Sequence, residues 1–162
     1  MEKIGLNSEV TIKFDELDFK IIQILQQNSK LSYNKIAKQL NVAAGTVYNR
    51  IKILEEKGIL KNYTVTVDPV KAGYALTVLI LIQAEGKKLI DAEHELAKSK
   101  NVILLYDITG DFDIAIIARF KNKIDLNSFV KNVLTKPYIK RTVTNIALNV
   151  IKEDLSISEF NF

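Results

Sequence analysis

The spacing of Ala37, Asn41 and Val47 constrains the fold of this chain more than any other feature. Ala37 is small enough to let two helices cross closely, and Asn41, four residues later, tolerates the left-handed backbone that a tight turn requires. Val47 lies ten residues after Ala37, where an apolar side chain fills the crossing. This spacing predicts a helix-turn-helix.

Apolar residues at intervals of three and four predict three short helices around that turn. The first begins at a capping Asp15. The second runs from a cap at Ser32 to Leu40. The third begins at about Ala44, and Gly58 ends it.

The third helix is the predicted recognition helix. Its apolar residues Val47, Ile51 and Leu54 share one face, so the opposite face presents polar and basic side chains suited to base edges and phosphates. The candidate DNA-binding residues are Tyr33, Ala44, Gly45, Thr46, Tyr48, Asn49, Arg50, Lys52 and Lys61.

The charge distribution agrees with a polyanion partner. Residues 28–64 carry seven Lys or Arg and two Glu, a net charge of +5 in a chain whose total is +4. A solvated lysine-rich surface is the alternative interpretation of the charge. For the helices, the alternative is a helical hairpin that exposes ordinary polar residues.

The residues after Gly58 predict the wing of a winged helix-turn-helix, because Tyr63, Val65 and Val67 alternate as in a strand. The second half then follows the order βαββαβ, which predicts an α+β fold with both helices on one face of a sheet. The expected strands are 75–84, 102–109, 113–120 and 142–151, and the expected helices are 89–98 and 126–134, the latter capped by Asp125.

The first of these strands also predicts a partner. Residues 78–82 are apolar on both strand faces, whereas a strand covered by helices on one side only should alternate. The chain has no further helices to cover the second face. We therefore expect a second copy of the chain to cover it in an obligate homodimer.

The segment 109–113 joins two strands and combines a flexible Gly110 with two carboxylates, Asp111 and Asp113. Such a loop can bind a small-molecule amine, or it can be a plain hairpin turn in which Gly110 supplies a positive φ. Two carboxylates without a third ligand predict no metal site.

Composition excludes several kinds of site. The chain has no Cys and a single His, which excludes disulfides, Cys-type zinc sites and His-rich metal sites. His94 lies between two Glu residues and is interpreted as helix surface. We therefore predict no catalytic residue, no metal and no cofactor.

The longest apolar run, residues 75–82, is shorter than the ~20 residues of a membrane helix. Residues 1–14 lack the apolar centre of a secretory signal, so we expect a cytoplasmic protein with no membrane partner.

Short motifs are spread over about residues 17–152. They are Leu17-Asp18, Ile24-Leu25, Ile36-Ala37, Thr46-Val47, Arg50-Ile51, the run from Leu54 to Leu60, Val67-Asp68-Pro69, Gly73, and the run from Thr109 to Asp113. Together they resemble the Lrp/AsnC family of bacterial and archaeal transcription regulators, also called feast/famine regulatory proteins.

The resemblance implies an N-terminal DNA-binding domain, a hinge near residues 68–73 and a ferredoxin-like, RAM-type C-terminal domain that dimerises through its sheet. Such proteins commonly assemble four dimers into an octamer and bind amino acids at contacts between dimers. The implied effector-binding residues are Tyr106, Thr109, Gly110, Asp111, Asp113, Thr142 and Thr144.

Two positions depart from the family pattern. Ala43 stands where the family usually has a Ser that caps the recognition helix, and Asn41 stands where the turn usually carries Gly. A missing cap removes about 0.5–2 kcal/mol of stability, unless Asn41 or a phosphate substitutes for it.

The predicted organisation has five parts. They are an N-terminal extension (1–14), a helix-turn-helix domain (15–64), a linker strand or hinge (65–73), an effector-binding and oligomerisation domain (74–152) and a tail (153–162).

The predicted function is a transcriptional regulator that reads double-stranded DNA with residues 45–52 in successive major grooves and responds to an amino-acid effector. The alternative is an amino-acid-sensing module that acts through protein partners. An enzyme that uses Asp111 and Asp113 as an acid–base pair is a third hypothesis, and the sequence offers it no nucleophile, phosphate-binding loop or metal cluster.

Overall fold

The computed structural model describes residues 15–157, so the N-terminal extension and the last five residues of the tail lie outside the described residues. The described chain forms two compact units. The first contains residues 15–65 together with 154–157, and the second contains residues 66–153. Within the described residues, no helix is both long and apolar enough to cross a membrane.

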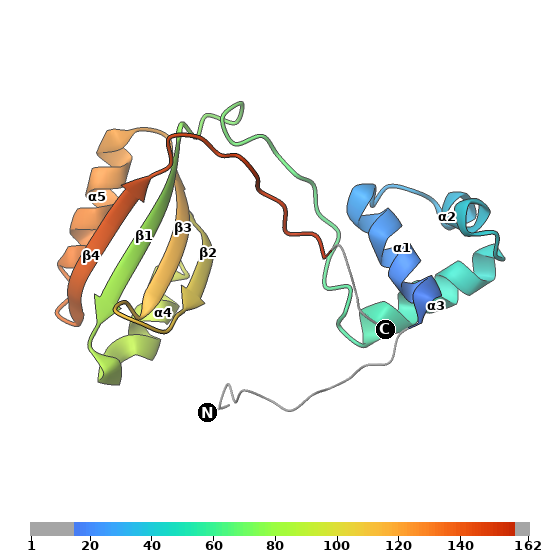
Figure 1. The fold of residues 1–162 in the computed structure, drawn as a ribbon, viewed down its shortest axis with the longest axis horizontal. Helices are drawn as coiled ribbons and strands as arrows, with labels where there is room; N and C mark the ends of the chain where they lie inside the picture. Colours follow the sequence, from blue (N-terminus) through green and yellow to red (C-terminus); the bar gives the residue numbers. More distant parts are fainter. Residues whose placement is uncertain (1–14, 158–162) are drawn as a thin grey trace. The chain divides into compact units, whose positions relative to one another are not determined.

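Three helices build the first unit: α1 (Glu16–Gln27), α2 (Tyr33–Leu40) and α3 (Ala44–Glu56) (Figure 1). The Asp15 side chain caps α1 by accepting from backbone N–H groups of its first turn. Asn41 follows α2 with φ 54°, in the left-handed region. The three-helix prediction and the turn at Asn41 are confirmed.

The core of this unit lies where the helices cross. Ala37 and Val47 are both buried, and they pack in one cluster with Ile21, Ile36 and Ile51. The small Ala37 therefore lies at the crossing that its spacing to Val47 predicts. The cluster holds α3 against α1 and α2 by one face only.

The C-terminal segment completes the first unit. The Gln26 carboxamide, oriented so that both of its polar atoms are satisfied, accepts from the Ile157 N–H at 2.9 Å and donates to the Ile157 carbonyl at 3.1 Å. The chain therefore leaves this unit, forms the whole second unit, and returns to α1.

The segment predicted to form the wing strand contains no strand in this single chain. Residues 57–75 contain no helix or strand, and Tyr63, Val65 and Val67 are 49%, 68% and 57% exposed. A strand needs a neighbour to pair its N–H and C=O groups, and the described residues offer none here. Alternation predicts a strand, but it cannot supply the partner that a strand requires.

The second unit is an antiparallel sheet with the strand order β2-β3-β1-β4 and two helices on one face, which confirms the βαββαβ prediction (Figure 1). Its main elements are β1 (Leu76–Ala84), α4 (Leu89–Leu96), β2 (Val102–Asp107), β3 (Ile114–Phe120), α5 (Lys123–Leu134) and β4 (Ile139–Ile146), with a 3-10 turn, η1 (Gly86–Lys88), before α4.

Several predicted boundaries are wrong: α4 ends at Leu96 instead of residue 98, β2 ends at Asp107 instead of residue 109, and β4 begins at Ile139 instead of residue 142. Asn122, not Asp125, caps α5: its Oδ1 accepts from the Asp125 N–H at 2.9 Å, because the helix begins three residues earlier than expected. The last strand ends at Ile146 rather than at residue 151. Its partner β1 begins at Leu76, so the residues after Ala147 run past the end of the ladder.

The two sheet faces differ in their covering. Val78, Ile80 and Ile82 are buried beneath α4 and α5. On the opposite face, Leu79 is 38% exposed and Leu81 is half-buried. Within the described residues, no helix covers this second face.

Candidate DNA interface and effector loop

The exposed face of α3 carries the predicted DNA-binding residues. Val47, Ile51 and Leu54 have exposed fractions of 0%, 1% and 2%, so they anchor the helix to the core. The residues of the opposite face are exposed, namely Gly45, Thr46, Tyr48, Asn49 and Lys52. The polar face is therefore held rigidly on a packed helix and is open to solvent.

Arg50 differs from these neighbours because its guanidinium is bound to α1. Its Nη1 lies 3.1 and 3.3 Å from the two carboxylate oxygens of Asp18 and 2.8 Å from the Asp15 Oδ2. Asp18 is the one buried charged residue among the described residues, with 7% of the whole residue exposed. The carboxylates at the start of α1 thus hold the recognition helix in place.

The two acids that bind Arg50 also cap α1. The Asp15 Oδ1 accepts from the Asp18 N–H at 3.0 Å, and the Asp15 N–H donates to the Asp18 Oδ2 at 3.2 Å, which is a reciprocal capping box. The backbone hydrogen bond from Asp18 lowers the pKa of Asp15 below its usual 3.8, and the nearby Arg50 adds to this effect. The spacing of three residues between Asp15 and Asp18 is the sequence signal for this capping box.

The start of α3 carries no side-chain cap. Ala43 makes no capping hydrogen bond, and the structure shows no cap from Asn41 either. Nearby, the Tyr33 and Tyr48 rings meet edge to face, with centroids 5.8 Å apart. This contact joins the start of α2 to the exposed face of α3.

Basic and hydroxyl groups continue toward the end of α3. Lys52 is 58% exposed, and its Nζ lies 3.8 Å from Glu56, a loose pair at the surface. The Tyr63 hydroxyl donates to Glu55 at 2.8 Å, and burial together with this bond raises the pKa of Tyr63. Lys61 lies exposed in the extended segment that follows the helix.

The loop between β2 and β3 is a tight connection with an exposed tip. The Ile108 N–H donates to the Asp113 carbonyl at 2.9 Å, and Gly110 has φ +114°, as a hairpin turn requires. Thr109 and Asp111 are exposed. The loop therefore serves as a turn while leaving polar groups free for a ligand.

Asp113 has a structural contact of its own. Its Oδ2 accepts from the Ala84 N–H at 2.8 Å, and its N–H donates to the Ile82 carbonyl at 3.0 Å. These bonds tie the loop to the end of β1. They also commit one carboxylate oxygen of Asp113 to the backbone of β1.

One chain does not bring all the predicted effector residues together. Tyr106 is 51% exposed on β2, at one edge of the sheet, while Thr142 and Thr144 lie on β4, at the other edge. Thr142 and Ile114 are both register partners of Ile82, so two strand spacings, about 10 Å, separate them.

Sequence reasoning missed Arg141. Its guanidinium carbon lies 5.3 Å from the centre of the Phe112 ring, a cation–π contact between β4 and the β2–β3 loop. The two residues are far apart in sequence, and no local pattern signals the contact. It places a cation beside the exposed tip of the loop.

The chain matches two family descriptions. Residues 14–61 match a winged helix-turn-helix DNA-binding family, and residues 77–157 match the Lrp/AsnC ligand-binding domain. An uncharacterised HTH-type transcriptional regulator of Pyrococcus abyssi is 49% identical over 88% of this chain and 97% of its own length.

Solved structures share the fold. An AsnC family transcriptional regulator from Agrobacterium tumefaciens has a TM-score of 0.84 at 25% identity, covering 90% of this chain and 97% of the other. A Neisseria meningitidis regulator, solved as a complex with L-methionine, has a TM-score of 0.81 at 24% identity, covering 90% and 97%.

Fold and matches define a DNA-binding regulator with a separate ligand-binding domain. The chain belongs to the Lrp/AsnC family of transcriptional regulators, as its motifs predicted. The P. abyssi relative is likewise named as a transcriptional regulator.

Proposed function

We propose that this regulator reads double-stranded DNA with the exposed face of α3. The observation that carries the proposal is the anchoring of that face by three buried apolar residues behind it. Asn49 offers donor and acceptor groups to a base edge, and Lys52 offers a cation to a phosphate. We leave Arg50 out of the contact set because Asp15 and Asp18 already bind it.

A salt titration of DNA binding by fluorescence anisotropy tests these roles. Lys52→Ala should weaken binding to all sequences and reduce the slope of log affinity against log salt by about 0.9. Lys20→Ala is the matched control, because Lys20 also pairs with a Glu four residues away but lies on α1. Equal slopes for the two variants would contradict a phosphate contact by Lys52.

Asn49→Ala tests base reading separately. It should relax the preference at one base position at a cost of about 1–3 kcal/mol there, while the salt slope stays unchanged. Binding to random-sequence DNA is the control. A uniform loss across all sequences would assign Asn49 to the DNA backbone instead of a base.

If the chain binds an amino acid but shifts no DNA at moderate salt, the protein-partner alternative replaces this proposal.

The effector is proposed to be an amino acid bound at the tip of the β2–β3 loop. The exposed Asp111 can accept from an ammonium group, and free N–H groups near Gly110 can donate to a carboxylate. Arg141, which contacts Phe112 in the same loop, adds a second group for the carboxylate. The L-methionine complex of the N. meningitidis regulator is a precedent within the same fold.

A homodimer, assembling further to an octamer, is the proposed form of the protein. Two features support it: the sheet face that carries Leu79 lacks a covering layer, and the segment with Tyr63, Val65 and Val67 is extended and apolar without a ladder partner. A second copy of the chain would cover both. Association would also bring Thr142 and Thr144 of one copy toward the loop of another.

Light scattering tests effector and assembly together. The mass of the protein is measured alone and with each of the twenty amino acids, then with DNA present. A ligand-dependent change in mass that disappears in Asp111→Asn supports the effector site and names the ligand. A fixed dimer that ignores every amino acid yet binds DNA would leave the loop as a turn only.

A further inference from the structure

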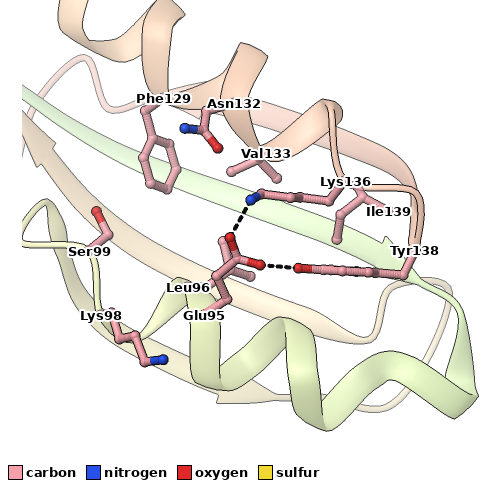
Figure 2. A pocket seen from close by; sticks show the side chains of 10 residues that line it. All are labelled: Glu95, Leu96, Lys98, Ser99, Phe129, Asn132, Val133, Lys136, Tyr138 and Ile139. Carbon is pink, nitrogen blue, oxygen red and sulfur yellow. Dashed lines mark hydrogen bonds and ion pairs between the residues drawn. The ribbon is translucent and has the colours of Figure 1, made fainter.

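A cavity of about 280 Å³ lies on the helix-covered side of the second unit, between the C-terminal ends of α4 and α5 (Figure 2). Its size is close to the lower limit of small-molecule sites, about 300 Å³. The apolar lining includes Leu96 and Val133, which are 8% and 5% exposed, and the half-buried ring of Phe129. This floor suits a compact aliphatic or aryl group.

One side of the cavity is fixed by a bridge between the helices. The Glu95 carboxylate on α4 accepts from the Lys136 ammonium and from the Tyr138 hydroxyl, which both come from the segment after α5 (Figure 2). These two bonds lower the pKa of Glu95, and the bond to Glu95 raises the pKa of Tyr138 to about 12. At neutral pH the charges of Glu95 and Lys136 therefore cancel, and the bridge forms an ordered wall of the cavity.

The remaining polar groups of the lining are the Lys98 ammonium, the Ser99 hydroxyl and the Asn132 carboxamide, and each of them can donate a hydrogen bond. Lys98 forms no ion pair with any residue between 15 and 157, so it leaves the lining with one net positive charge beside the Glu95–Lys136 pair. The Ser99 hydroxyl accepts from the Asn101 N–H at 3.4 Å and keeps its own hydrogen for another acceptor. Donors beside an apolar floor match a carboxylate with an apolar body.

We propose that this cavity binds a small monocarboxylate with a branched or aryl group, with the carboxylate on the side lined by Lys98 and Ser99 and the apolar group on the floor formed by Leu96, Phe129 and Val133. All these residues belong to the second unit and lie apart in sequence from the 109–113 loop. The cavity would thus be a second ligand site, which shares no lining residue with the 109–113 loop. A ligand there would link α4 to α5.

The probe is 4-methylpentanoate, titrated into the full chain and followed by NMR of backbone amides and methyl groups. Saturable shifts should appear at Leu96 and Val133, with a dissociation constant of roughly 0.1–1 mM for so small a ligand. The matched amine, 3-methylbutylamine, should bind at least about tenfold more weakly. Equal binding of the acid and the amine would overturn the proposed ligand class.

Lys98→Gln should weaken 4-methylpentanoate binding about tenfold. Lys100→Gln is the control, because Lys100 is an exposed neighbour outside the lining, and unchanged melting temperatures show that both variants fold. Asp111→Asn separates this cavity from the loop. Shifts centred on residues 109–113, loss of binding in Asp111→Asn alone, or no saturation by about 20 mM would each overturn the proposal.

Discussion

Arg50→Ala removes the cation that joins α3 to the start of α1. The Asp18 side chain is 9% exposed and that of Arg50 is 35% exposed. The pair therefore lies between an exposed ion pair, worth about 1 kcal/mol or less, and a buried one, whose disruption costs about 3–5 kcal/mol. Asp18 would keep its bond from the Asp15 N–H at 3.2 Å. We expect the free energy of unfolding of the first unit to fall by about 2 kcal/mol.

Native-state hydrogen exchange measures this change separately in each unit. Protection of core amides in α1 and α3 should fall by about 30-fold, while amides in the sheet should stay unchanged. Lys52→Ala is the control on the same helix: its pair with Glu56 is loose and exposed, so the expected loss is about 0.5 kcal/mol or less. Unchanged protection in Arg50→Ala, or an equal loss in the sheet, would refute the reasoning.

A double-mutant cycle isolates the pair. Asp18→Asn in the Arg50→Ala background removes the buried charge that the first substitution leaves unpaired, so the double variant should recover part of the lost stability. In DNA titrations, Arg50→Ala should weaken binding without changing the salt slope, because Arg50 orients the helix and contacts no phosphate. A reduced slope would return Arg50 to the DNA-contacting set.

Three further outcomes are expected from thermal or urea unfolding. Ala43→Ser should stabilise the first unit by about 0.5–2 kcal/mol, because it supplies the missing cap of α3. Asp113→Ala should destabilise the second unit by about 1–3 kcal/mol through the orphaned Ala84 N–H, whereas Asp111→Ala should change stability little. Glu93→Gln should raise the melting temperature at pH 7, because burial, with Asp107 adding to it, raises the pKa of Glu93 and its Oε1 has no partner. The charged form of Glu93 opposes folding above its usual pKa of 4.5, so the gain should disappear as the pH falls below that value.

Local periodicity was sufficient to predict the helices and their buried faces. The positions of Val47, Ile51 and Leu54 depend on a repeat of 3.6 residues, which the sequence displays directly. The turn at Asn41 was also predictable from local sequence, because the tolerance of Asn for the left-handed backbone is a property of the residue itself.

Contacts between distant residues could not be predicted in this way. Arg50 and Asp18 are 32 positions apart, so the pattern that makes Arg50 a DNA-binding candidate gives no sign of its partner on α1. Arg141 lies over Phe112 only after the sheet has formed. The segment after α3 forms no strand in a single chain for a related reason: alternation describes one strand, but pairing requires a second.

The return of residues 154–157 to α1 also orders events during synthesis. Residues 66–153 must all be made before Ile157 can reach Gln26. At about 5–20 residues per second, these 88 residues (153 − 65) take roughly 4–18 s. The helix-turn-helix emerges first, but its last contact forms only after the ligand-binding domain has been translated. A nascent chain thus has a period in which its DNA-reading part is present but unfinished.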